Sequence, residues 1–430
     1  MKTTALWFLG STLALVAAQP ACATNSPIRS CKGRVKVFIL AGQSNMEGHG
    51  GIRTLDELGA HPTLGHLLKK IKKADGSFVV RDDVFISYNR GKERGQEVIK
   101  APLTVGQGAH NDRIGPELMF GIGMGDYYQE PVLLIKTAWG GKDLYCDFRP
   151  PSAGKPAYDI PDKPANQIPS TPRDVGLYYR KMVEDVHQSL DNLATDFPQF
   201  KGMGYELCGF VWFQGWNDMC AAKEIQQKVF DEYADNFVHL VQDLRAEFKV
   251  PNLPVVIGEV GVDGDLHFKP NMAGLRAAQA KIASRPELKG TLGYVRTAPF
   301  WYDKLDILPK KLQAEKSRIK RAIQEQLKKE LKDTPAASDP KKVEQRVNAA
   351  VDKACKEDKQ FLSVRAEHDK VVSHWVCHYY GSARVYCLAG NAFAEAMKEL
   401  VKEKSAAPDP GMSSSSAVRT TMPGAPSRLP

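Results

Sequence analysis

The segment Gly42-Gln43-Ser44-Asn45-Met46 places a serine just after a glycine that ends a short apolar run. A serine hydroxyl is a weak nucleophile, so an enzyme that uses one presents it on a sharp turn, beside a base and beside donors for an oxyanion. A strand followed by a glycine and then the serine provides that exposure. Ser44 is therefore a candidate nucleophile, although a glycine-x-serine segment after a strand also occurs in plain turns.

A second polar segment, Gly215-Trp216-Asn217-Asp218, follows another apolar run at residues 209–215. An asparagine amide at the tip of a strand can donate to an oxyanion, and one such donor is worth about 3 kcal/mol of transition-state stabilisation. The alternative interpretation of Asn217 is an Asx turn that caps the next helix. The segment is thus a candidate for either catalysis or capping.

Five apolar, β-branched runs predict the strands that would position these residues. They are residues 34–41, 131–138, 209–215, 254–261 and 293–300. Between them, hydrophobic side chains recur at three- and four-residue spacing, which predicts helices. These helices are residues 175–193, 230–244 and 273–282. Strands that alternate with helices favour a mostly parallel five-stranded sheet covered on both faces.

The polar candidates all follow these predicted strands. In strand order they are Ser44, Trp139, Asn217, Glu259, and then Asp303 with Asp306. Because parallel sheets place their chemistry at the carboxyl ends of the strands, we expect these side chains to lie at one edge of the sheet.

Length and charge bound the rest of the chain. With 430 residues, 43% of them hydrophobic, the chain can build a full-sized core. Much of the net charge of +9 lies in residues 304–370, where lysines are mixed with glutamates. This mixture predicts a solvated helical hairpin inserted into the fold, with a substrate lid or a partner surface as the alternative, and it argues against nucleic-acid binding. Residues 32–303 and 371–403 would then form the main domain.

The two ends of the sequence have compositions of their own. Lys2, an apolar run and small residues predict a signal peptide over residues 1–23, and hence a secreted or periplasmic protein. No later stretch predicts a membrane span. The eight cysteines allow some disulfides in such a location, but their irregular spacing indicates no disulfide framework and no metal site. Residues 404–430, rich in Ser, Pro and Ala, predict a disordered tail.

Taken together, the motifs resemble those of SGNH hydrolases. GQSNM and GWND are similar to the first and third sequence blocks of that clan, and Gly115 in IGPELMFG matches the glycine of the second block. Within the clan, the likeness is to the sialate O-acetylesterase and acetylxylan esterase group, carbohydrate esterase family six. It extends over residues 35–397, without the charged insertion, through FILAGQSNMEGHG, IKTAWGGKDL, DFRPPSAG, FVWFQGWND, LRAAQAK and HYYGSARVY.

This resemblance implies a three-layer α/β/α, flavodoxin-like fold and a serine-esterase mechanism. Ser44 would attack the acetyl carbonyl, and the N–H groups of Ser44 and Gly115 with the side chain of Asn217 would hold the oxyanion. A histidine after the last strand would act as the base. His378, which opens HYYGSARVY, is the expected base, and His374 is the alternative.

The expected acid of the triad departs from the family pattern. Many SGNH enzymes carry it three residues before the histidine, but that position is Trp375 here. Asp306 is the expected replacement, and Asp303 and Glu259 are the alternatives. A serine–histidine dyad assisted by a backbone carbonyl is a further alternative.

The resemblance also implies the function. It predicts a carbohydrate O-acetylesterase, of sialate or xylan type, that forms an acetyl-enzyme and needs no cofactor and no metal. Gln43, Gln214 and Trp139 are expected to line the sugar cleft, with a purely structural role as the alternative for each. The alternative function is a catalytically inactive carbohydrate-binding protein on an esterase fold, and Trp375 motivates it. The sequence carries no signal for an oligomeric state.

Overall fold

The computed structural model describes residues 33–90, 97–157, 173–265, 269–331 and 339–406. The predicted signal peptide at residues 1–23 lies outside this part of the chain. The last helix continues to Ala406, so it extends past the predicted start of the tail at residue 404. The rest of the predicted tail lies outside the described residues.

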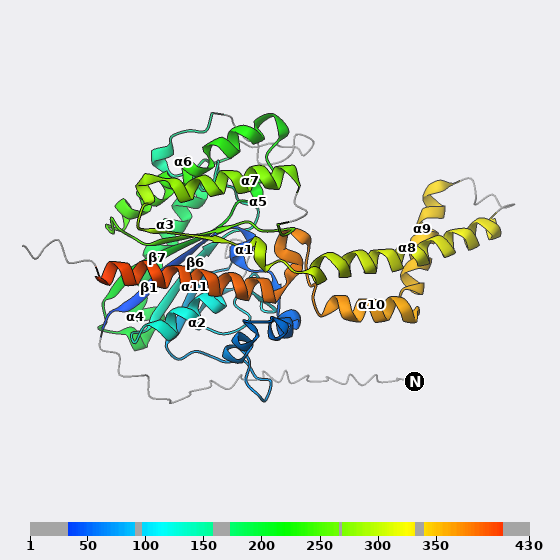
Figure 1. Cartoon of the computed structure of the whole chain (residues 1–430), viewed down its shortest axis with the longest axis horizontal. Helices are drawn as coiled ribbons and strands as arrows, with labels where there is room; N and C mark the ends of the chain where they lie inside the picture. Colours follow the sequence, from blue (N-terminus) through cyan, green and yellow to red (C-terminus); the bar gives the residue numbers. More distant parts are fainter. Residues whose placement is uncertain (1–32, 91–96, 158–172, 266–268, 332–338, 407–430) are drawn as a thin grey trace, which may run out of the picture.

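A seven-stranded sheet forms the centre of the molecule (Figure 1). Its order is β4 (Val98–Pro102), β3 (Val84–Asn89), β6 (Val132–Ala138), β1 (Val35–Gly42), β7 (Tyr205–Phe213), β8 (Val255–Glu259) and β9 (Leu292–Arg296). Neighbouring strands are parallel except β4, which runs antiparallel to β3. The central strand β1 is almost wholly buried because β6 and β7 cover its edges and helices cover its faces.

The expected mostly parallel sheet is confirmed, but the expected number of five strands is wrong. The two additional strands are β3 and β4. In β3, Ser87 and Asn89 interrupt the apolar run, and in β4 the exposed Lys100 does the same. In β3 these polar side chains are paired with Ser189 and Asp185, and β4 is an edge strand, where polar residues are tolerated. Neither strand therefore has the continuous apolar pattern of a central parallel strand.

Helices cover both faces of the sheet (Figure 1). On one face lie α2 (Glu117–Tyr127) and α11 (Ala383–Ala406), and on the other lie α3 (Leu177–Asp191), α6 (Lys223–Glu247) and α7 (Pro270–Ala280). The short elements are α1 (Ser44–Glu47), β2 (Gly50–Gly51), η1 (Ile52–Ala60), η2 (Gly65–Lys70), β5 (Arg113–Ile114), α4 (Leu193–Asp196), α5 (Trp216–Met219) and η10 (Val376–Gly381). Gly390 lets α11 approach α2 closely, because a Cβ there would collide with the Pro116 carbonyl.

The charged insertion is a group of three helices, so the expected two-helix hairpin is corrected. They are α8 (Asp303–Leu331), α9 (Pro340–Ala354) and α10 (Lys359–Asp369), and they project from the sheet domain (Figure 1). The sequence predicts α9 and α10 as one helix, because both are short and rich in charged residues. A small core of their own holds them together, made of Ile319, Val347, Val351, Cys355 and Phe361.

Two further expectations concern membranes and cysteines. Among the described helices, none combines the length and the apolar character that a bilayer crossing requires. The six cysteines in the described ranges are free thiols: Cys146, Cys208, Cys220, Cys355, Cys377 and Cys387. Packing, rather than disulfides, therefore holds this part of the fold together.

Candidate active site

Ser44 lies on the turn between β1 and α1. Gly42 makes this turn with a φ of +153°, and a Cβ at this position would collide with the carbonyl oxygen of Phe213 on the neighbouring strand. Only glycine fits there, because it tolerates both the conformation and the close approach. The turn places Ser44 at the first position of α1, with 8% of its surface exposed.

Gln43 connects the Ser44 turn to the Asn217 segment. Its Oε1 accepts hydrogen bonds from the backbone N–H groups of Gly215 and Asn217, both at 3.1 Å. Its Nε2 donates to Asn217 Oδ1 at 2.9 Å. Since the oxygen of the Asn217 amide is occupied in this way, its Nδ2 group remains available as a donor. The arrangement is the one an oxyanion donor needs.

Asp218 connects the same segment to the loop after β6. Its buried carboxylate accepts hydrogen bonds from the N–H groups of Leu144 at 3.0 Å and Tyr145 at 3.1 Å, and from Gln214 Nε2 at 2.6 Å. Burial and the nearby Asp143 raise the pKa of Asp218, and the hydrogen bonds act in the opposite direction. The carboxylate thus holds two strand-end loops in a fixed relation.

Gly115 does not present a free N–H group. Its N–H donates to Glu117 Oε1 at 2.8 Å in the interior, and Glu117 Oε2 pairs with Lys136 Nζ at 2.8 Å. The expected oxyanion role of the Gly115 N–H is therefore corrected, because this donor is satisfied by Glu117. Gly115 thus contacts the buried Glu117–Lys136 ion pair in the interior.

The glycine pair after β6 lies closer to the nucleophile. A Cβ built on Gly140 would lie 3.6 Å from Ser44 Cβ, and one built on Gly141 would lie 4.0 Å from Asn217 Nδ2. Within the described residues, neither Gly140 nor Gly141 donates a backbone hydrogen bond. The sequence signal that could have found them is a glycine pair directly after a predicted strand.

A hydrogen-bonded bridge joins the Ser44 turn to the loop that carries His378. Asn45 Nδ2 donates to the carbonyl of Cys377 at 3.2 Å, across 332 positions of the chain. The Tyr386 hydroxyl donates to Asn45 Oδ1 at 2.8 Å and lies 3.4 Å from the carbonyl oxygen of His378. The neighbours of the two candidate catalytic residues are therefore held together by their side chains.

The backbone after His378 is strained and firmly held. Tyr379 and Tyr380 have φ values of +50° and +54°, a left-handed conformation that costs on the order of 1–3 kcal/mol for each non-glycine residue. The buried Tyr379 hydroxyl offsets this cost by accepting from Gly261 N–H at 2.8 Å and by pairing with Thr297 Oγ1 at 2.7 Å. The loop is thereby anchored to the ends of β8 and β9.

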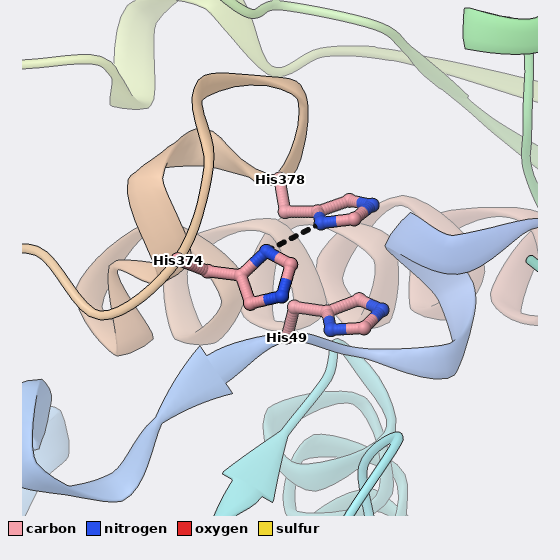
Figure 2. A group of neighbouring side chains, drawn as sticks. All are labelled: His49, His374 and His378. Atoms are coloured by element: carbon pink, nitrogen blue, oxygen red, sulfur yellow. Dashed lines mark hydrogen bonds between the residues drawn. The ribbon is translucent and has the colours of Figure 1, made fainter. Parts of the chain in front are cut away.

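The rings of His49 and His374 lie against the ring of the expected base, His378 (Figure 2). His378 Nδ1 lies 2.7 Å from His374 Nδ1, and the His49 ring stacks on the His378 ring with centroids 4.1 Å apart. Burial, His49, His374 and Arg113 lower the pKa of His378 to about 3. Burial and His49 likewise lower the pKa of His374 to about 4. Both imidazoles are therefore neutral at neutral pH.

None of the expected acids lies beside His378, and this is a correction. Asp306 accepts from Trp301 Nε1 at 2.9 Å, Glu259 accepts from the Tyr294 hydroxyl at 2.6 Å, and Asp303 is exposed at the start of α8. In the part of the chain that the structure describes, the hydrogen-bond partner of the His378 ring is His374. The expectation that residues after the strands meet at one edge of the sheet fails for Asp303 and Asp306, because they belong to a helix that leaves the sheet domain.

The residues expected to line the sugar cleft are buried, so that expectation is also corrected. Gln43 and Gln214 expose 1% and 0% of their surface, and both serve the hydrogen-bond network described above. Trp139 exposes 7% and packs against the ring of Tyr178. Polar and aromatic residues at strand ends are thus used here to hold loops, whereas a sequence pattern cannot separate that use from substrate contact.

The fold is that of an α/β protein with a mostly parallel central sheet, and the candidate site lies at the carboxyl ends of its central strands. A family model described as "carbohydrate esterase, sialic acid-specific acetylesterase" matches residues 34–290, which is more than half of the chain. The chain therefore belongs to this carbohydrate acetylesterase family. No curated protein sequence matches it.

Several solved structures are similar to this chain. A protein from Arabidopsis thaliana is 15% identical with a TM-score of 0.36, and the likeness covers 61% of this chain and 86% of that one. A carbohydrate acetylesterase from Xanthomonas citri is also 15% identical with a TM-score of 0.36, over 61% of this chain and 49% of that one. The protein NanS is 12% identical with a TM-score of 0.35, over 62% and 79%.

Replacing Gln43 tests the orientation of the Asn217 amide. Gln43→Glu keeps the acceptor for the two backbone N–H groups but places a second acceptor against Asn217 Oδ1. The amide is then expected to reverse, so that its oxygen faces the site. We expect kcat on 4-nitrophenyl acetate to fall by about 10²–10³-fold, the cost of one oxyanion donor, with little change in KM.

A double-mutant cycle provides the control for this prediction. If Gln43 acts through Asn217, the double variant Gln43→Glu/Asn217→Ala loses no more activity than Asn217→Ala alone. Losses that multiply in the double variant would show that Gln43 acts independently of Asn217.

Proposed function

We propose that this protein is a serine-dependent carbohydrate O-acetylesterase that removes acetyl groups from sugars of sialate or xylan type. The observation that supports the proposal is the bridge from Asn45 to the His378 loop, because it ties the residue next to the candidate nucleophile to the loop that carries the candidate base. The composition of residues 1–23 supports a site of action outside the cytoplasm.

The proposed reaction proceeds in two steps. His378 takes the proton of the Ser44 hydroxyl as its oxygen attacks the acetyl carbonyl, and the protonated base then donates to the leaving sugar oxygen. Water next attacks the acetyl-enzyme, again with His378 as the base, and releases acetate. The oxyanion is held by the Ser44 N–H, by Asn217 Nδ2 and by an N–H group of the Gly140-Gly141 pair, which lies beside both side chains.

We place His374 in the position of the missing acid. With His378 Nδ1–H donating to the unprotonated Nδ1 of His374, the opposite nitrogen of His378 is the one that accepts the serine proton. His374 thus selects the tautomer and the ring orientation of the base. Because His374 is neutral, it stabilises the transient imidazolium less than a carboxylate would.

Trp375 supports a role in binding the sugar. This side chain is 77% exposed, although large apolar residues are usually covered, and its ring centroid lies 6.2 Å from that of His374. An exposed aromatic face next to a catalytic centre offers an apolar platform for the carbon-bound hydrogens of a sugar ring. We propose that Trp375 holds the carbohydrate part of the substrate.

Removing the nucleophile tests the proposed function directly. We expect Ser44→Ala to lower acetate release from 4-nitrophenyl acetate and acetylated xylan by at least about 10³-fold, since the proposed acetyl-enzyme forms on the Ser44 oxygen. A fluorophosphonate probe should label the wild-type protein at Ser44. The exposed Ser284→Ala serves as the control. A wild-type protein that binds sugar but resists the probe would support the inactive binding protein instead.

Removing the ring of His374 tests its positioning role. We expect His374→Ala to lower kcat by about 10–10²-fold with KM nearly unchanged, because the base loses its orienting partner. Added imidazole, which fits the space left by the ring, should restore part of the rate. The exposed His66→Ala is the control. Unchanged kcat in His374→Ala, or a loss that imidazole does not rescue, would contradict the role.

Truncating Trp375 tests the sugar platform. We expect Trp375→Ala to raise KM for acetylated xylan about 2–10-fold, equivalent to the loss of one aromatic contact. The rate on methyl acetate, which has no ring to stack, should not change. The KM of Trp375→Phe for acetylated xylan should lie between those of the wild-type protein and Trp375→Ala. Equal effects on the sugar ester and on methyl acetate would show that Trp375 acts on the chemistry and not on the sugar.

A further inference from the structure

His49, His374 and His378 form a cluster that the proposed ester chemistry does not fully use. Each of the three rings offers a nitrogen, and these nitrogens lie within 4.8 Å of one another. Figure 2 shows the rings gathered side by side, with His49 supplied from the segment after α1 and the other two from the loop near η10. The bridge through Asn45 and Tyr386 holds these segments together.

We propose that this cluster binds a divalent first-row transition ion of the zinc class, and that the bound ion inhibits the esterase by occupying His378. The binding half of the proposal stands on the cluster alone. The inhibitory half rests on the proposed function, in which His378 is the base.

The strongest support comes from His49. It is 9% exposed, and its Nδ1 is buried without a hydrogen-bond partner. A buried polar atom left unpaired destabilises the fold, so its retention points to a partner that binds there. The ring performs no step of the proposed ester hydrolysis, and a metal ligand accounts for its nitrogens.

The ligand nitrogens are close enough to share one ion, but the His49 ring is stacked on the His378 ring and must turn for their lone pairs to converge on it. Zinc binds imidazole nitrogens at about 2.0–2.1 Å in a tetrahedral arrangement, which sets ligand nitrogens roughly 3.3 Å apart. The Nδ1 atoms of His378 and His374, now 2.7 Å apart, would separate by about 0.6 Å and exchange their shared proton for the ion. Three imidazoles with a fourth position open to water form a known type of zinc site.

One acidic and one basic side chain lie near the histidine cluster, and their effects on a bound cation are opposite. Glu47 Oε2 lies 3.8 Å from His49 Nε2 and contributes negative charge beside the ligands. Arg113, whose Nη1 donates to Ser373 Oγ at 2.7 Å, contributes positive charge, and its Nε lies 3.5 Å from Asp112 Oδ1. Neutral nitrogen ligands favour zinc, copper or nickel over magnesium or calcium, which prefer oxygen.

Inhibition follows from the lone pairs of the imidazole. An ion bonded to Nδ1 of His378 leaves the one proton of that ring on Nε2, the nitrogen that would accept the proton of Ser44, so Nε2 has no lone pair to offer. The ion also displaces the contact with His374 that orients the ring. The sequence held no sign of this site, because His49 lies far along the chain from the other two ligands and forms no spacing motif with them.

The experiment measures binding first and activity second. Metal-free protein is titrated with Co²⁺, which reports tetrahedral coordination by its visible absorption, and with Zn²⁺ in competition with a chromophoric chelator. His49→Phe keeps a ring stacked on His378 but removes both nitrogens, and His66→Phe is the control at an exposed histidine. We expect the wild-type protein to bind one ion per chain. His49→Phe should bind the ion at least about 10-fold more weakly, and His66→Phe should bind it as the wild-type protein does.

Turnover of 4-nitrophenyl acetate is then measured over the same Zn²⁺ concentrations. We expect inhibition at the concentrations that fill the site, reversal by EDTA, and at least a 10-fold shift in His49→Phe. An active enzyme that binds no ion, or that binds it equally well in His49→Phe, overturns the metal site. Binding without inhibition overturns the inhibitory half. Binding by a protein that has no esterase activity supports the site and overturns only the proposed function.

Discussion

The site depends on one hydrogen-bonded bridge, in which Asn45 links the turn after the first strand to the loop just before the last helix. Ser44 and His378 come from distant parts of the chain, and this contact joins the segments that carry them. The bridge is short because α11 packs tightly on α2 and brings Tyr386 beneath Asn45. Packing on one face of the sheet is therefore what sets the geometry at the sheet edge.

Much of the fold could be predicted because its central strands are buried on both faces. β1, β6, β7 and β8 appear in the sequence as mostly apolar runs, since nearly all of their positions are buried. β3 and β4 were not predicted, because polar residues interrupt their apolar patterns. The insertion was recognised by its charge, but charge composition does not reveal where one helix ends and the next begins.

The candidate site was only partly predictable, for a related reason. Ser44, Asn217 and His378 lie in compact motifs whose chemistry can be inferred from residue type and position. Gly115 was chosen from its match to the second sequence block of the family, and Asp306 from its place after the fifth predicted strand. The hydrogen bonds that these two residues make are with Glu117 and Trp301. The partnership of His374 with His378 has no sequence signal of its own, because a histidine pair four residues apart is common in ordinary helices and loops.

The left-handed tyrosines after His378 carry a consequence for how the protein becomes functional. Such a conformation is unstable until Tyr379 is seated against Gly261 and Thr297, and those partners exist only once the far edge of the sheet has assembled. A partly folded chain, or one still emerging from the ribosome, would hold its serine on a formed turn while the base remains unplaced. The loop that carries the candidate base therefore takes its place only after the strands that supply Gly261 and Thr297 have joined the sheet.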